Sequence, residues 1–421
     1  MNGRLTPKRL ALISMNQKKK PVKKESDGRF LFVLAGALIL AVIFIAAIVL
    51  STPAEPAVAG QSDTIRIGAI YNLNGSQSSL DIPSAQGARL AAEMINERGS
   101  IGGRPVVLTV YDGKTNSTEI VRAAKKLVDE DHVQAMIGMS DSDMVLPAAH
   151  VAADAHIVFV TSGATSPVLP SQVPGYLYLS CFGDNTQAAA AAEFAASDLS
   201  ATKAAVVMDN SMEYTRLLSK YFIERFTDGG GRVTAVVPYA DGSGVSSLSM
   251  SLGDAAASSP DVVFAACGPE NCGAVIRAIR SAGITAPVIG GDSMDSPQLA
   301  TAAGPDAGRI YYTTHGDIST SSADPNVSAF IKRYYLEYGE MPNAFAALGY
   351  DTVNVVAQAA AASPDDIRAG LLSIKGYDGL TGNISYLNDS QIPEKSVTIM
   401  KLENGKVRTV GERMPRIVPE P

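Results

Sequence analysis

Two short stretches of small polar residues each follow a run of apolar residues. Residues 139–143 (MSDSD) follow the run Ala135–Gly138, and residues 162–166 (SGATS) follow the run Ile157–Thr161. Hydroxyl groups and free backbone N–H groups can bind a carboxylate without a full countercharge, because several donors share the anion and a helix dipole adds to them. The same residue types are also common helix caps. Spacing alone therefore leaves an anion site and simple capping equally open.

The patterns that indicate catalysis or metal binding are missing from the sequence. None of the four histidines stands in His-Glu-x-x-His spacing, and no Cys-x-x-Cys pair offers zinc ligands. Gly291-Asp292-Ser293 resembles the start of a nucleophile block, but there is no Gly-x-Ser-x-Gly elbow and no Gly-x-x-x-x-Gly-Lys-Ser/Thr phosphate loop. We therefore expect no enzymatic activity, no catalytic residue, no cofactor and no metal site.

From Thr64 onward, short β-branched runs alternate with Ala-rich helical segments. This alternation predicts an α/β fold of parallel sheets with helices on both faces, and the number of units favours two lobes. A helix is expected over Pro83–Arg98, because Pro83 suits a first helical turn and Gly99 a stop. The expected strands are Thr64–Tyr71, Val106–Val110, Ala135–Gly138, Ile157–Thr161, Ala204–Met208, Val233–Val237, Val262–Ala265, Pro287–Gly290 and Ile310–Thr313. Both polar stretches then lie beyond the carboxyl ends of strands, where open parallel sheets bind ligands.

Several motifs, in order from Ile65 to about Val407, resemble the type I periplasmic binding proteins that serve branched-chain amino-acid ABC transporters. They are residues 87–96 (GARLAAEMIN), 102–106 (GGRPV), 111–112 (YD), 136–138 (MIG), 161–167 (TSGATSP), 276–283 (IRAIRSAG) and 377–384 (YDGLTGNI). The resemblance implies two Rossmann-like lobes joined by three crossovers, which close over a solute. Lobe 1 is then expected over residues 64–182 plus 316–375, and lobe 2 over 183–315 plus 376–421.

The resemblance also implies a set of ligand-binding residues. In the amino-acid binders of this family, lobe-1 loops hold the solute carboxylate, and the matching positions are Ser142, the backbone of Gly163, and Thr165. An acid at the end of a lobe-2 strand holds the ammonium, which matches Asp292, where the known leucine binder has Glu. Tyr214 is the nearest match to the lobe-2 aromatic residue that closes on the ligand.

The clearest departure from the family is Gly268, where the amino-acid binder places a tyrosine against the ligand. Leucine, isoleucine and valine are therefore not secured as solutes. The expected function is the solute-binding component of an importer that acts with an ABC permease on an amino acid or related zwitterion. The alternatives are a ligand-sensing ectodomain that acts with a signalling partner, and a binder of an amide, urea or aromatic acid.

The N-terminus predicts export of the folded body. Residues 1–29 hold nine Lys/Arg against two Asp/Glu, and residues 30–50 are 21 consecutive apolar residues, which suits a transmembrane helix with the basic tail in the cytoplasm. A cleaved signal segment is the competing interpretation. The body is expected on the extracytoplasmic face of the membrane if the segment is retained as an anchor, and secreted if it is cleaved. Residues 51–63 are expected to form a linker.

The remainder of the chain carries 26 Lys/Arg and 40 Asp/Glu, which argues against nucleic-acid partners. The three cysteines leave open whether Cys267 and Cys272 are bridged or reduced.

Overall fold

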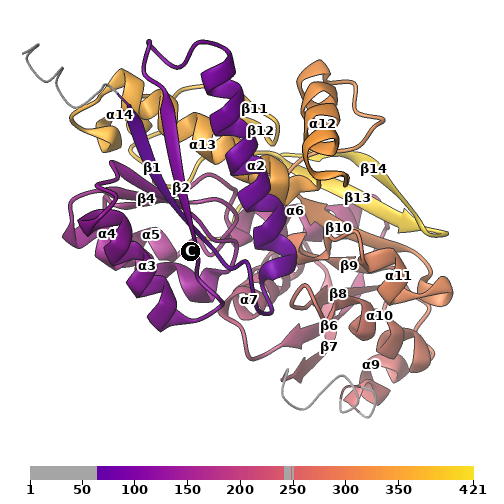
Figure 1. The fold of residues 1–421 in the computed structure, drawn as a ribbon. Helices are drawn as coiled ribbons and strands as arrows, with labels where there is room; N and C mark the ends of the chain where they lie inside the picture. The colour runs from indigo at the N-terminus through magenta and orange to yellow at the C-terminus, as the bar shows by residue number, and fades with distance from the viewer. Residues whose placement is uncertain (1–63, 241–247, 249–250) are drawn as a thin grey trace, which may run out of the picture. The chain divides into compact units, whose positions relative to one another are not determined.

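The apolar runs between residues 65 and 179 form one parallel sheet (Figure 1). In the computed structural model, the described residues are 64–240, 248 and 251–421. The sheet has the order β2-β1-β3-β4-β5. Its strands are β1 (Ile65–Tyr71), β2 (Val106–Asp112), β3 (Ala135–Gly138), β4 (Val158–Thr161) and β5 (Leu177–Leu179). We call this sheet and the helices packed on it lobe 1.

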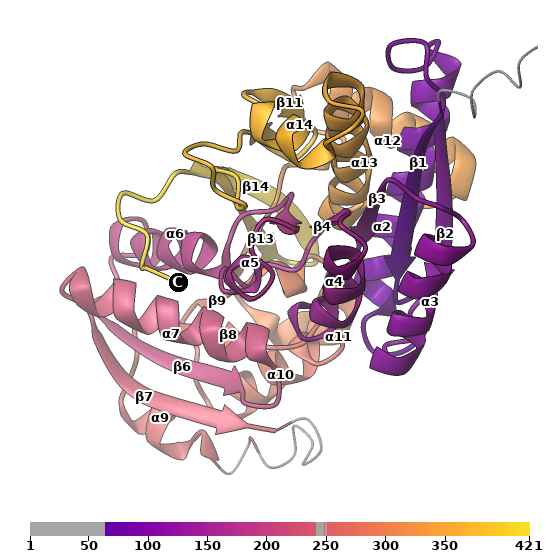
Figure 2. The same cartoon turned by 90° about the vertical axis from the view of Figure 1, so that its left-hand side faces the viewer.

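Helices cover both faces of the lobe-1 sheet. Residues of α2, α12 and α13 share one hydrophobic core with Ile65 and Ile67 of β1, whereas residues of α3 and α4 pack with Ile70 on the other face. Helices α2 and α13 lie side by side (Figures 1 and 2). The lobe-1 helices are α2 (Ser78–Glu97), α3 (Ser117–Asp129), α4 (Val145–Asp154), α5 (Leu169–Gln172), α12 (Pro325–Tyr338), α13 (Ala344–Ala362) and α14 (Ile367–Ser373).

The second sheet defines lobe 2 and has the order β14-β13-β10-β9-β8-β6-β7. Strands β13 and β14 pair antiparallel and the other strands pair parallel, except that β10 meets β13 antiparallel. Its strands are β6 (Lys203–Asp209), β7 (Arg232–Tyr239), β8 (Val262–Ala266), β9 (Val288–Gly290), β10 (Ile310–Thr314), β13 (Val397–Glu403) and β14 (Lys406–Arg413). Its helices are α6 (Asp184–Ser197), α7 (Glu213–Asp228), α9 (Gly253–Ala257), α10 (Cys272–Ser281) and α11 (Leu299–Ala303).

The nine predicted strands are confirmed, to within a residue or two at their ends. They were readable because a parallel strand buried on both faces is apolar throughout, as in β8, where every residue is buried. Strands β5, β13 and β14, and the pair β11 (Tyr377–Gly379) and β12 (Gly382–Ile384), were not predicted. Strand β14 is a largely exposed edge strand, so its sequence lacks an apolar run.

The helix predicted over Pro83–Arg98 begins earlier than expected. It starts at Ser78, which places Pro83 inside the helix. A proline near the start of a helix removes one backbone hydrogen bond and is tolerated better there than in the middle. The extra turn matters because Leu80 within it and Gln77 just before it line the candidate site.

The chain passes between the sheets three times, after β5, after β10 and after β12. At the first two passages the rings of Phe182 and His315 stack with centroids 4.0 Å apart. At the third, Lys395 Nζ donates to the Ser180 carbonyl oxygen at 3.1 Å. The three connections are therefore tied to one another.

The β11-β12 pair belongs by its packing to lobe 1. Leu380, Ile384 and Tyr386 lie in the same hydrophobic core as strand β1. The chain joins the second sheet only at Val397, about twenty residues beyond the boundary expected at residue 376.

The predicted basic tail, the membrane-spanning or signal segment and the linker all fall within residues 1–63, outside the described residues. Within the described part of the chain, no helix has the length and apolar character required to cross a bilayer.

Candidate functional site

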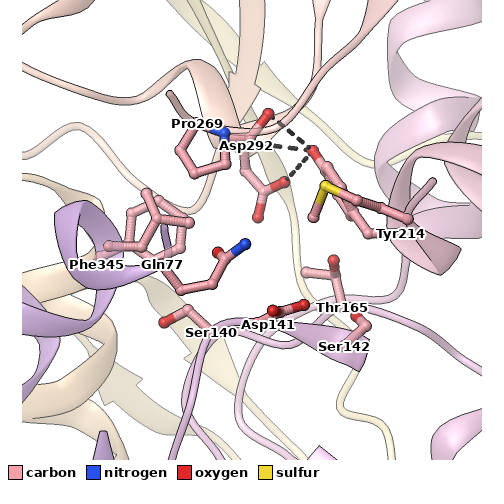
Figure 3. Close-up of a pocket in the computed structure, with 12 residues that line it drawn as sticks. Gln77, Ser140, Asp141, Ser142, Thr165, Tyr214, Pro269, Asp292 and Phe345 are labelled. Carbon is pink, nitrogen blue, oxygen red and sulfur yellow. Dashed lines mark hydrogen bonds between the residues drawn. The ribbon is translucent and has the colours of Figure 1, made fainter. Parts of the chain in front are cut away.

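A pocket lies between loops of the two lobes, with an empty volume of about 290 Å³ (Figure 3). Seven of its lining residues come from lobe 1 and five from lobe 2. They are Gln77, Leu80, Ser140, Asp141, Ser142, Thr165 and Phe345, and Met212, Tyr214, Pro269, Asp292 and Ser293.

The lobe-1 wall is built at the carboxyl ends of β3 and β4. Asp141 caps the short 3₁₀ turn Ser142–Met144 by accepting a hydrogen bond from the Asp143 N–H at 3.0 Å. Ser142 Oγ accepts from the Ser166 N–H at 3.1 Å, which joins the two polar loops. The Thr165 carbonyl accepts from the Asp184 N–H at 2.7 Å. The two loops thus bring the hydroxyl residues Ser142 and Thr165 to one wall.

Gly163 is not among the residues that line the pocket. Its N–H already donates to the Met139 carbonyl at 3.1 Å. A Cβ built at Gly163 would lie 3.0 Å from Ser140 Oγ and 3.2 Å from the Phe345 ring. The small size of Gly163 therefore lets Ser140 and Phe345 approach each other behind the wall.

Asp292 forms the centre of the lobe-2 wall and is almost completely buried. Its Oδ1 accepts from the Tyr214 hydroxyl at 2.8 Å and from Gln187 Nε2 at 3.1 Å. Its Oδ2 lies 2.9 Å from His315 Nε2. Because a carboxylate has about four acceptor positions, these three contacts hold Asp292 in place and leave room for a ligand donor.

Burial sets the protonation of the groups around Asp292. It lowers the pKa of His315, although the hydrogen bond to Asp292 and the charge of Asp292 act to raise it. It also raises the pKa of Tyr214 well above its usual value, and the charges of Asp292 and Asp184 act in the same direction. Tyr214 is therefore a neutral donor toward Asp292. The lobe-2 wall thus presents one acid supported by neutral donors.

Direct hydrogen bonds join the lobes beside the pocket. The Ser166 hydroxyl donates to Glu213 Oε1 at 3.0 Å, and the Glu213 N–H donates to both carboxylate oxygens of Asp143 at 3.0–3.1 Å. On another side, Asn343 Nδ2 donates to the Asp295 carbonyl at 3.1 Å. The lobes are therefore in contact on two sides of the pocket.

A disulfide closes the loop that carries Pro269 to the pocket. Cys267 and Cys272 are bonded, with their Cα atoms 5.3 Å apart, which settles the pairing that the sequence left open. Gly268 follows Cys267 directly, and a Cβ there would lie 3.2 Å from Met212 Sδ. Met212 therefore occupies part of the space beside Gly268.

We expect the double substitution Cys267→Ser and Cys272→Ser to lower the free energy of unfolding by roughly 2 kcal/mol, since a short cross-linked loop restricts the unfolded chain by about that amount. Urea denaturation of the full-length chain measures it. A reducing agent should lower the wild-type midpoint to that of the variant and leave the variant unchanged. Equal midpoints for variant and oxidised wild type would contradict this role of the bond.

The sequence analysis missed three parts of this site. Gln77 precedes the first turn of α2 and Leu80 lies in that turn, in a stretch that was read as a loop. Phe345 comes from the start of α13, far along the chain, and no spacing signal connects it with the polar loops. Gln187 and His315 are buried behind Asp292 and were given no role there. Among the described residues, no group of three or more His, Cys, Asp or Glu side chains is placed to hold a metal ion.

Four of the five predicted residues, Ser142, Thr165, Tyr214 and Asp292, line this one pocket (Figure 3). In the figure the Asp292 carboxyl group and the Gln77 amide both point into the pocket. The arrangement places hydroxyl and amide donors on one side and an acid on the other. It can hold a small molecule that is negative at one end and positive at the other.

Comparison of the sequence with known proteins finds similarity to binding proteins. A family model described as periplasmic binding protein matches residues 64–406. The Leu/Ile/Val-binding protein BraC3 of Rhizobium johnstonii is 26% identical over 347 residues, which cover 82% of this chain and 93% of that protein.

Solved structures that share the fold include two proteins named for amino-acid binding or transport. The leucine binding protein LivK of Thermotoga maritima has a TM-score of 0.75 at 27% identity, with 84% of this chain and 99% of that chain covered. The branched-chain amino acid transporter substrate binding protein LivJ of Streptococcus pneumoniae, in complex with isoleucine, has a TM-score of 0.74 at 25% identity, with 85% and 100% covered.

Proposed function

Because the chain belongs to the periplasmic binding protein family, we propose that it is the solute-binding component of an ABC importer and clamps an amino acid or related small zwitterion between its lobes. The observation that carries this proposal is the pocket between the lobes in which Ser142 and Thr165 of lobe 1 face Asp292 and Tyr214 of lobe 2. The similarity to the isoleucine-bound LivJ supports the same class of solute.

In this proposal the solute carboxylate binds the lobe-1 wall. Ser142 Oγ, the Thr165 hydroxyl and the backbone of the two loops share its charge, as several donors can share one anion. The N–H of Gly163 already donates to the Met139 carbonyl and is not free for the solute. Gly163 instead supports this wall by its small size. The solute ammonium binds Asp292, while Tyr214 and His315 keep that carboxylate in position.

Closure follows from the two-sided contact. A solute that touches both lobes binds the closed form better than the open form and therefore shifts the population toward closure. The hydrogen bonds of Ser166 and Asp143 with Glu213 form only when the lobes meet, so they add to the closed state. A permease partner can then recognise the closed form as the loaded one. The body would work outside the cytoplasm, with residues 1–63 supplying the anchor or signal.

The test is a thermal-shift panel on the full-length chain with amino acids, amides, urea and small aliphatic and aromatic acids. A ligand that binds only the folded state raises its stability, by about 2.7 kcal/mol at one hundred times its dissociation constant. We expect at least one amino acid to raise the melting temperature. Stabilisation only by aromatic acids or by none of the panel would contradict the proposed solute class.

A further inference from the structure

The pocket opens into a second, larger space that forms its mouth. This mouth has an empty volume of about 830 Å³ and shares Gln77, Asp141, Met212 and Pro269 with the inner pocket. The shared residues show that the two spaces adjoin. A solute longer than the inner pocket would therefore extend toward the mouth.

The walls of pocket and mouth carry only one sign of charge. Their acidic residues are Asp141, Asp143, Asp209, Glu270 and Asp292, and none of the described residues that line either space is Lys, Arg or His. Two basic residues near these spaces do not line them. Arg216 is exposed and donates to the Asn210 carbonyl, and the neutral ring of His315 lies buried behind Asp292. The path of the solute is therefore anionic.

Asp141 stands where the two spaces meet and is 5% exposed. Among the described residues, its one hydrogen-bond partner is the Asp143 N–H, which donates to its Oδ1. Burial raises the pKa of Asp141 to about 7, with the charges of Asp143 and Asp81 acting in the same direction. A cation beside Asp141 would relieve this cost of holding a charged carboxylate out of water.

Asp209, on the lobe-2 side of the mouth, gives an independent observation. Its side chain is fully buried, and its Oδ1 accepts from both the N–H and the hydroxyl of Ser211. Its Oδ2 is buried with no hydrogen-bond partner among the described residues. A buried carboxylate oxygen without a partner is costly, so a donor from a ligand in the mouth would stabilise it.

We infer that the solute carries a second positive charge besides its α-ammonium group, and that Asp141 at the junction of pocket and mouth and Asp209 in the mouth select it. This inference rests on the proposed function. The solute class is that of the diamino carboxylic acids and their guanidino analogues, such as lysine, ornithine and arginine. The α-carboxylate and α-ammonium bind the inner pocket, and the side chain places its cation toward the mouth.

The test compares L-lysine with L-norleucine, which has a side chain of nearly the same length without the terminal ammonium. Isothermal titration on the full-length chain should give an affinity for lysine at least about tenfold higher than for norleucine, the scale of one hydrogen bond to a charged group. Asp141→Asn keeps an acceptor for the Asp143 N–H and should remove most of this preference. Asp209→Asn should reduce it as well.

The matched control is Asp154→Asn, an exposed acid at the end of α4, which should leave both affinities unchanged. Norleucine or leucine binding as tightly as lysine to the wild-type chain would overturn the inference and leave the proposed function intact. The inference would also fail if Asp141→Asn weakened lysine and norleucine equally, because that result indicates a structural role. If no amino acid bound at all, the proposed function itself would fail. The wild-type comparison decides the question even if a variant does not fold.

Discussion

Replacing Asp292 by Asn should weaken the binding of the amino-acid solute by ~1.5 to 3 kcal/mol, or about 10- to 150-fold in the dissociation constant, because a hydrogen bond to a charged group contributes on that scale. The substitution removes the charge and keeps the shape. The amide oxygen of the new Asn side chain can still accept a hydrogen bond from the Tyr214 hydroxyl. Its NH2 group can donate to Nε2 of the neutral His315 ring once the ring proton is on Nδ1 instead. Isothermal titration with the best solute of the panel measures the effect.

The control for Asp292→Asn is again Asp154→Asn, which removes an exposed charge far from the pocket walls. Equal melting temperatures of free wild type and variant would show that the buried network has survived. Unchanged affinity of a folded Asp292→Asn variant for the true solute would remove Asp292 from the ammonium site.

Gly138→Ala should lower the free energy of unfolding by about 3 kcal/mol or more, the cost of a strained backbone position with an added clash. Gly138 ends β3 with a φ of 131°, in the region that only glycine adopts easily. A Cβ there would lie 1.9 Å from the Ile70 carbonyl oxygen on the neighbouring strand. The solute should also bind more weakly, since the loop that carries Ser142 begins at the next residue.

Urea denaturation of the full-length chain measures the Gly138 effect. Gly253→Ala is the matched control, because Gly253 begins α9 and its added Cβ would have no neighbour within 4 Å. We expect a change within about 0.5 kcal/mol there. A Gly138→Ala midpoint equal to that of wild type would show that this close approach of β1 and β3 is not required.

The sequence predicted the parallel core well, because its strands are buried on both faces and form continuous apolar runs. Polar loops at the ends of such strands follow from the same topology, which is why Ser142, Thr165 and Asp292 could be found. Their assignment to roles came from the family resemblance. In the structure these three residues line the pocket, whereas Gly163 does not line it and lies close to Ser140 and Phe345.

What the sequence did not reveal depends on contacts between distant segments. Phe345 reaches the pocket only because α13 packs beside α2. Gln77 was hidden by Pro83, which suggested a later helix start. The network of Gln187 and His315 behind Asp292 joins two lobe-2 elements and a crossover, and no local pattern encodes it. The Cys267–Cys272 bond depends on how their loop folds over the end of β8.

The most direct measurement is a crystal structure of the full-length chain with the tightest solute of the panel bound. It should show the solute between the lobes, with its carboxylate within hydrogen-bond distance of Ser142 and Thr165 and its ammonium beside Asp292. A solute bound outside this cleft, or a pocket filled by the protein's own side chains in the presence of saturating solute, would contradict the account.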